Sequence, residues 1–328
     1  MKKLLFLIVG FMGLSLLAGC SSDSLSEYLE ASEKTNTIEK GNTKMSLRAD
    51  LDFETEGLSD KQMRELSYFD QIDIESNTQF DSSDEMEKVI SKTYFNFGGV
   101  GFDSVFYMNG EQMFIQMPII KDYIRLDSFF DSYLDNNEEG SFSSSEDLLR
   151  PFYERWMEIL GEEDVVKGKK TYVLTDEGQI KASTYSISIS KEQLKDLSNE
   201  MLKVLKDKRF FELVQKGAYY EGDLNEAQML DLIEEYTNRV TLEGFEGNVY
   251  VDFDGLIVKK GYHLSLGMND TKVGELKGID LSFELEYANL GEEQVFQFPT
   301  VKEDEWLKVE DANIESLLPE GLLNEWGE

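Results

Sequence analysis

Apolar and polar residues alternate with a period of two along much of this chain, and that pattern predicts β-strands. It is clearest at Met45–Phe53, where every second residue is apolar, as in a strand with one buried and one solvated face. The same reasoning predicts strands at Leu66–Phe80, Lys88–Phe97, Lys170–Leu174, Gln179–Ile189, Val249–Phe253, Leu256–Leu266 and Leu281–Tyr287, with Phe296 and Phe298 closing the series.

Two expected helices carry complete start signals, each a capping box inside a hydrophobic staple. In the first helix Ser190 and Gln193 form the box, and Ile189 and Leu194 form the staple. Its apolar stripe is Leu194, Leu197, Met201, Leu202 and Leu205. In the second helix the box is Asn225 with Gln228, and the staple is Leu224 with Met229.

Two further helices are expected from apolar spacing. The first is a short one at Leu25–Lys34, and the second is Leu148–Leu160, begun or kinked at Pro151. The polar, acidic residues Asn136–Ser145 predict a loop before the second. The chain shows no repeat of fixed period and no linker rich in Pro, Gly or Ser, so residues 25–328 are expected to form one domain ending in an acidic tail.

The stretch Tyr94–Tyr133 is rich in aromatic residues and methionine. Within it, Asn109-Gly110 predicts a hairpin, because a type I′ turn requires positive φ at both central positions. Apolar residues occupy both faces of these strands, so both faces are expected to be covered, by helices or by something else. Flexible methionine and flat aromatic side chains suit an adaptable apolar pocket. The alternative is an ordinary core beneath amphipathic helices.

The N-terminus has the order of an export signal. Lys2 and Lys3 precede an uncharged apolar run, Leu4–Leu17, which is 14 residues long. A transmembrane helix needs roughly 18 to 20 such residues, so the run is interpreted as an export signal and not as a membrane span.

The next residues, Leu17-Ala18-Gly19-Cys20, resemble the lipobox of bacterial lipoproteins. The resemblance implies that the Cys20 thiol carries a diacylglycerol and that signal peptidase II cuts before Cys20. Residues 1–19 are then a signal peptide and residues 20–24 a lipidated tether, which places the protein on the extracytoplasmic side of the cell membrane. The alternative is an ordinary secretory signal with an incidental cysteine.

Acidic residues outnumber basic ones by 66 to 32, which gives a net charge of −34, or about −36 once Lys2 and Lys3 are removed. Such a surface repels phosphate backbones, so nucleic acid is excluded as a partner. The charge could attract a basic partner in the cell envelope; simple solubility of an exposed surface is the alternative.

Candidate chemistry is sparse. His263 is the only histidine and Cys20 the only cysteine, so the usual zinc and iron sites and Cys/His catalysis cannot be assembled. No G-x-S-x-G elbow is present either. We therefore predict a non-enzymatic protein without catalytic residues, metal or cofactor, in which His263 is an ordinary strand residue.

Carboxylates are numerous, but none is singled out by its spacing. Asp252 and Asp254 end a strand at a D-G hairpin and lack the surrounding residues of a calcium loop, so a structural role is expected. Asp135–Glu139 could hold calcium weakly, although a solvated loop is favoured. A hydrolase built on paired carboxylates ranks last among the possible functions.

The order of elements, a lipobox, a short helix, a long antiparallel meander, central helices and further strands, resembles the LolA/LolB-like superfold. The mycobacterial LppX and LprG lipoproteins and many Gram-positive lipoproteins share it. The resemblance spans about residues 25–299. It implies an α+β fold in which a large curved antiparallel sheet, a half-barrel, has helices packed on its concave face.

In that group the space between sheet and helices carries lipids or lipid-anchored proteins. The resemblance therefore implies an acyl chain or similar apolar ligand here, with Phe106, Met108, Phe114 and Met117 as candidate wall residues. The competing hypothesis is a surface interaction or sensor module with a filled core. A cavity with apolar walls would favour the first, and a close-packed interior the second.

Overall fold

The computed structural model describes residues 23–84, 86–110, 112–118, 122–126, 143–175, 178–207, 226–302 and 306–308. The export signal and Cys20 lie outside these residues, as do the acidic run 135–139 and Trp326. The helices are α2 (Ser24–Asn36), α3 (Asp60–Leu66), α5 (Ser143–Ile159), α6 (Lys191–Leu205) and α8 (Glu226–Arg239). The strands are β1 (Lys40–Phe53), β2 (Gln71–Asp81), β3 (Lys88–Phe97), β4 (Val100–Asn109), β5 (Gln112–Gln116), β6 (Tyr123–Arg125), β7 (Val165–Lys167), β8 (Thr171–Thr175), β9 (Gly178–Ser188), β10 (Val240–Val251), β11 (Ile257–Met268), β12 (Leu276–Ala288) and β13 (Trp306–Lys308).

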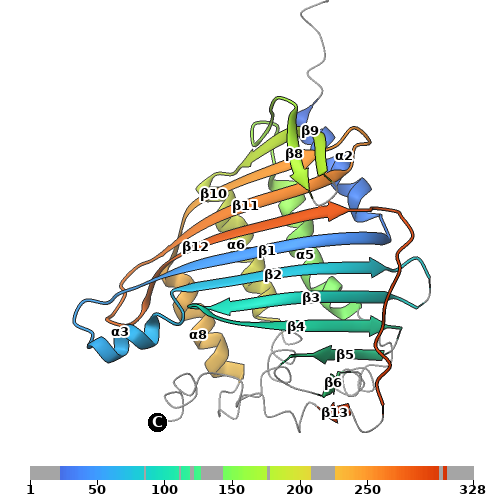
Figure 1. The fold of residues 1–328 in the computed structure, drawn as a ribbon. Helices are drawn as coiled ribbons and strands as arrows, with labels where there is room; N and C mark the ends of the chain where they lie inside the picture. The colour runs from blue at the N-terminus through green and yellow to red at the C-terminus, as the bar shows by residue number, and fades with distance from the viewer. Residues whose placement is uncertain are drawn as a thin grey trace, which may run out of the picture.

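The fold is α+β and is dominated by one large, open, curved sheet of thirteen strands (Figure 1). Two antiparallel meanders, β1 to β6 and β9 to β12, meet where β1 pairs with β12. This seam joins Asn42 to Ala288 and Leu47 to Phe283, so residues from both ends of the domain form the middle of the sheet. The expected antiparallel sheet is thus confirmed in its main part, but the sheet is mixed, because β13 pairs with β6 in parallel.

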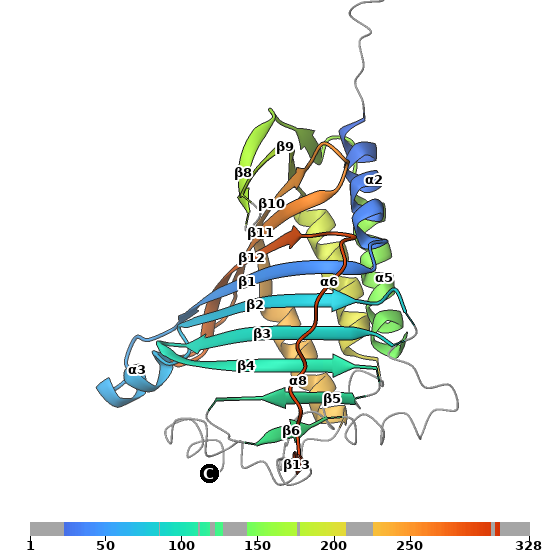
Figure 2. The ribbon, with the colours of Figure 1, turned by 45° about the vertical axis from the view of Figure 1, so that its right-hand side comes forward.

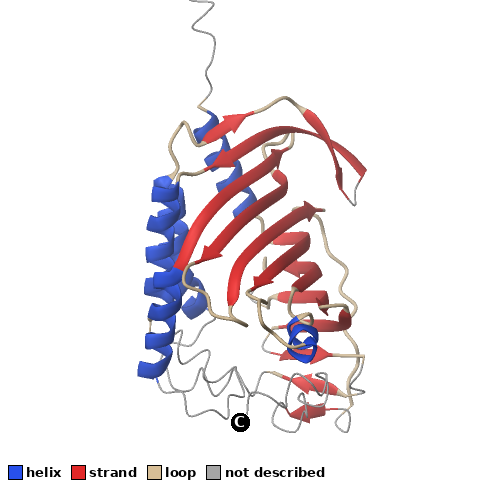
Figure 3. Cartoon of the chain, turned by 90° about the vertical axis from the view of Figure 1, so that its left-hand side faces the viewer, coloured by secondary structure: helices blue, strands red, loops and turns tan. Residues whose placement is uncertain are grey.

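Different elements cover the two faces of the sheet. The helices α2, α5 and α6 lie on one face, which we call the helix face (Figures 1 and 2). The extended segment 289–302 crosses the opposite face on its way to β13 (Figure 2). There Lys40 forms an ion pair of 2.7 Å with Glu293, and the Gln79 amide donates to Gln294 Oε1 at 3.1 Å. Figure 3 shows the long helices in a layer beside the curved strands.

The largest buried cluster lies where α2, α6 and β7 pack on β9 to β11. Val249 and Ile187, which are 0% and 1% exposed, occupy its centre. A hydroxyl in α2 also ties that helix to the sheet, because the Ile257 N–H donates to Thr35 Oγ1 at 2.8 Å. This cluster holds α2, the helix that follows the expected tether, against the sheet.

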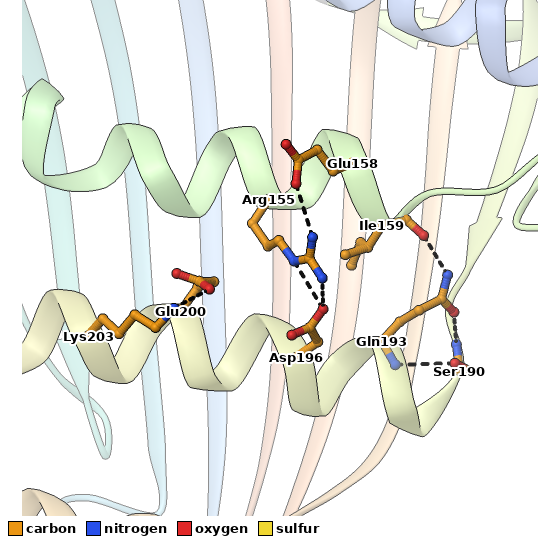
Figure 4. A network of polar contacts seen from close by, with 8 residues as sticks. All are labelled: Arg155, Glu158, Ile159, Ser190, Gln193, Asp196, Glu200 and Lys203. Atoms are coloured by element: carbon orange, nitrogen blue, oxygen red, sulfur yellow. Dashed lines mark hydrogen bonds and ion pairs between the residues drawn. The ribbon is translucent and has the colours of Figure 1, made fainter.

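The predicted capping box of α6 is present and also connects α6 to α5 (Figure 4). The Gln193 N–H donates to Ser190 Oγ at 3.2 Å, and Gln193 Oε1 accepts from the Ser190 N–H at 2.7 Å. The same side chain donates to the Ile159 carbonyl at 2.8 Å, at the end of α5 where backbone carbonyls lack helical partners. One turn further along, Arg155 of α5 donates to Asp196 of α6.

We expect Gln193→Ala to lower the free energy of unfolding by about 2 kcal/mol, because it removes half of a helix cap and one bond between two helices. Urea denaturation followed by circular dichroism would measure the change. Glu192→Ala, at the exposed neighbouring position, is the matched control and should change stability by less than about 0.5 kcal/mol. Equal losses in both variants would show that Gln193 does not link the helices.

Several sequence expectations need correction. The strand predicted from Leu66 begins at Gln71, since Asp60–Leu66 is the helix α3, with a capping box of Ser59 and Gln62. Helix α5 begins at Ser143, inside the predicted loop, and contains Pro151. Phe253 does not continue the buried face of β10; it lies in the following turn and is 90% exposed. The second predicted capping box includes Asn225, outside the described residues, although the helix itself, α8, is present.

Candidate apolar ligand-binding cleft

An open cleft of about 700 Å³ lies on the helix face, between α2, α5 and α6 on one side and β10 to β12 on the other. Of its twenty described lining residues, fourteen have aliphatic, aromatic or thioether side chains without a hydroxyl or charge. They are Phe152, Trp156, Leu194, Leu197, Met201, Leu202, Leu205, Val240, Leu242, Phe245, Leu264, Leu266, Leu281 and Phe283.

The strand wall of the cleft follows from simple alternation. Side chains two residues apart on a strand share a face, and so do residues opposite one another on neighbouring strands. Tyr262 of β11 lies opposite Phe283 of β12, and Leu264 lies opposite Leu281. The period-two patterns in these two strands therefore place their apolar side chains in one continuous wall.

The helix wall comes largely from the apolar stripe of α6 that the sequence predicts. All five residues of this stripe line the cleft. Leu194 and Leu197 are buried, whereas Met201, Leu202 and Leu205 are half-buried. Trp156 of α5 completes the wall. Its indole packs edge-on against Phe245 at a centroid distance of 5.4 Å and against Tyr262 at 6.3 Å.

A row of stacked rings forms one side of the cleft. Phe245 stacks on Tyr262 at 5.8 Å, and Tyr262 stacks on Phe283 at 6.4 Å. The row needs a glycine beneath it, because a Cβ on Gly247 would lie 2.9 Å from the Tyr262 ring and 3.2 Å from the Ile187 side chain. The rings present flat apolar faces, which suit an alkyl chain or a ring system.

Polar groups in the lining are few. Ser32 and Asn36 come from α2 and Ser198 from α6, and Lys260 of β11 is the one formally charged residue among the described lining. The Nζ atom of Lys260 lies 5.6 Å from the centre of the Tyr287 ring, within the range of a cation–π contact. No described residue of the lining is acidic, although the whole chain carries 66 acidic residues.

The four wall residues expected from the sequence do not form one wall. Phe106 and Met108 share a face of β4, while Tyr107 between them faces the other way. Because Phe114 of β5 lies opposite Tyr107, Phe114 is on the face away from Phe106. Met117 follows β5 directly. None of the four is among the described residues that line the cleft, which lies across the sheet at β10 to β12.

The aromatic stretch instead packs against itself. Phe114 is 4% exposed and contacts Tyr107 at 4.9 Å, Tyr123 at 5.7 Å and Trp306 at 5.2 Å between ring centroids. Burial raises the pKa of the Tyr107 phenol, which agrees with a closed apolar cluster. On the helix face Phe95 stacks on Phe102 at 5.1 Å. The cluster around Phe114 is thus covered in part by β13, whereas on the helix face Phe95 and Phe102 remain half-buried.

The other candidate groups have structural surroundings. His263 lies in β11, half exposed, with Nδ1 3.2 Å from Ser282 Oγ and Nε2 3.3 Å from Ser265 Oγ. Asp252 Oδ1 accepts the N–H groups of Asp254 and Leu256 at 2.8 and 2.9 Å, so it holds the hairpin turn. Within the described ranges, no group of three or more potential metal ligands is found, and no helix is long and apolar enough to cross a membrane.

Comparisons with known proteins add little. No protein-family model matches the chain, and no curated protein matches it. Among solved structures, an N-terminal dehydratase from the difficidin assembly line can be superposed over 83% of each chain, with 8% identity and a TM-score of 0.13. A similarity of that size supports no statement about fold or activity.

Proposed function

We propose that this chain is a lipoprotein, anchored through Cys20 on the extracytoplasmic side of the cell membrane, that binds a lipid or another apolar ligand between its sheet and its helices. The observation that carries the proposal is the cleft itself. Its volume of about 700 Å³ falls within the roughly 300–1,000 Å³ typical of small-molecule sites, and its walls are mostly apolar. In a filled interaction module these side chains would contact one another instead of lining an open space.

The arrangement also supports the relation to the LolA/LolB-like superfold, in which the space between sheet and helices holds the ligand. The large curved sheet and the helices on one of its faces agree with that architecture.

A second feature supports a position close to a membrane. Tyr172 and Leu174 of β8 are 66% and 72% exposed, and Phe253 is 90% exposed with Lys170 Nζ 5.5 Å from its ring centre. Strand β8 and the turn between β10 and β11, which contains Phe253, lie at the end of the molecule where α2 begins (Figures 1 and 2). Exposed aromatic rings next to lysine side chains suit the interface between water and lipid, where apolar stems are buried and charges stay hydrated.

The first test is to purify the chain from Ser21 onward, which keeps every described element, and to look for bound lipid by extraction and native mass spectrometry. We expect close to one apolar ligand per chain. Leu264→Trp places a larger side chain in the cleft and should lower ligand occupancy at least tenfold, since a side chain then occupies the ligand's space.

The matched control is His263→Trp, the same new side chain one residue away on the exposed, opposite face of β11. It should keep the wild-type occupancy. A well-folded wild-type protein that carries no lipid and binds none when lipid is added would refute the proposal. An interaction module that uses the acidic surface to contact a basic envelope partner would then be the better reading.

A further inference from the structure

Two adjacent lysines of β11 have opposite surroundings. Lys259 faces away from the helices and forms ion pairs with Glu284 at 3.0 Å and Glu286 at 2.9 Å. Lys260 faces the helix side, as consecutive strand residues must alternate, and lines the cleft. Among the described interactions, its ammonium group has one, with the Tyr287 ring.

Lys260 is the one charged residue in the described lining of the cleft, and no carboxylate accompanies it there. Acidic residues outnumber basic ones two to one, and a random neighbour of a lysine is more often acidic than basic. Yet within the described part of the chain no carboxylate pairs with Lys260, and none lines the cleft. Lys260 is half-buried, so part of its apolar stem is covered by the cleft wall.

We propose that the occupant of the cleft is a single-chain amphiphile with one anionic headgroup, of which a long-chain fatty acid is the simplest example, and that Lys260 binds its carboxylate. This inference rests on the proposed function. One cation without an acidic neighbour balances one negative charge, and a charge-assisted hydrogen bond between ammonium and carboxylate is stronger than a neutral one.

The remaining lining fits the other end of such a molecule. The apolar side chains and stacked rings of β10 to β12, opposite α6, form a continuous surface for an alkyl chain. Each methylene that enters strengthens binding by a factor of about four. A cleft of about 700 Å³ suits one ligand of drug-like size, which favours one chain over the two or three chains of a membrane lipid.

The test compares two ligands with the same sixteen-carbon chain, hexadecanoate with an anionic headgroup and hexadecanol with a neutral one. Each displaces the neutral fluorescent probe N-phenyl-1-naphthylamine from the chain beginning at Ser21. We expect wild-type protein to bind hexadecanoate about tenfold more tightly than hexadecanol, the usual size of a hydrogen bond to a charged group. Lys260→Met keeps the length of the apolar stem and should abolish that preference, while binding of the probe and of hexadecanol stays unchanged.

Lys259→Met is the matched control, because it removes a neighbouring charge on the opposite face, and it should keep the tenfold preference. Equal affinity of wild-type protein for both ligands, or an unchanged preference in Lys260→Met, would overturn the assignment of Lys260 and leave the apolar cleft standing. If the wild-type protein binds neither ligand nor the probe, the proposed function itself fails, and the inference fails with it.

Discussion

Replacing Cys20 with serine should move this protein from the membrane fraction into the soluble fraction. The proposed anchor is lipid on the Cys20 thiol, which a serine hydroxyl cannot replace in the lipobox. Each buried methylene contributes about 0.8 kcal/mol, so two acyl chains hold a protein stably, whereas loss of both leaves only weak surface contacts. We expect nearly all of the wild-type protein in the membrane pellet and less than about a tenth of the variant.

The measurement is centrifugation of cell membranes after a high-salt wash, combined with metabolic labelling by radioactive palmitate. Ser22→Ala, two residues further along the tether, is the matched control and should stay labelled and membrane-bound. A Cys20→Ser protein that remains in the washed membrane without palmitate would show that another segment anchors the chain, and the assignment of the lipobox would be wrong.

The anchor and the cleft are close together in the chain. Asp23, the N-cap of α2, follows Cys20 by three residues, which span at most about 11 Å when fully extended. Helix α2 itself contributes Tyr28, Ser32 and Asn36 to the cleft lining. In the proposed lipoprotein, the helix that leaves the membrane surface is therefore also a wall of the ligand site, so a lipid could pass between bilayer and cleft over a short distance.

Local signals in the sequence predict local structure well. The capping box at Ser190 and the alternation in Met45–Phe53 depend on neighbouring residues alone, and both features are present in the structure. The box at Ser59 and Gln62 is equally visible in the sequence, but the helix after it is short and none of its residues is buried. Because so short a helix has little apolar patterning of its own, the apolar residues from Leu66 onward predict a longer strand than the one that forms.

The position of the cleft could not be predicted in this way. Alternation shows which residues of a strand share a face, but it does not show which helix packs on that face. The seam between β1 and β12 and the packing of α2 on β7 and β11 join distant parts of the chain. The aromatic residues around Phe114 predict burial, and Phe114 is indeed buried. Its neighbouring rings pack against it, however, and the open cleft lies beside Tyr262.

The structure separates a close-packed cluster from an open cleft, and this difference predicts where truncation is most harmful. Ile187 is 1% exposed within the cluster of α2, β7, β9 and β10, so Ile187→Ala should lower the free energy of unfolding by about 3–4 kcal/mol through lost burial and a residual cavity. That is a large share of the roughly 5–15 kcal/mol typical of a folded domain.

Leu264→Ala gives the comparison within the cleft. Leu264 already borders open space and is only partly buried, so its truncation creates little new cavity and should lower the free energy of unfolding by less than about 2 kcal/mol.

Val166→Ala, at a site 59% exposed on β7, is the control for a surface truncation and should change stability by less than about 0.5 kcal/mol. Urea denaturation monitored by tryptophan fluorescence would rank the three variants. If Leu264→Ala were as destabilising as Ile187→Ala, the residues around Leu264 would be packed as tightly as those around Ile187. That result would contradict an open ligand site and support a filled interior.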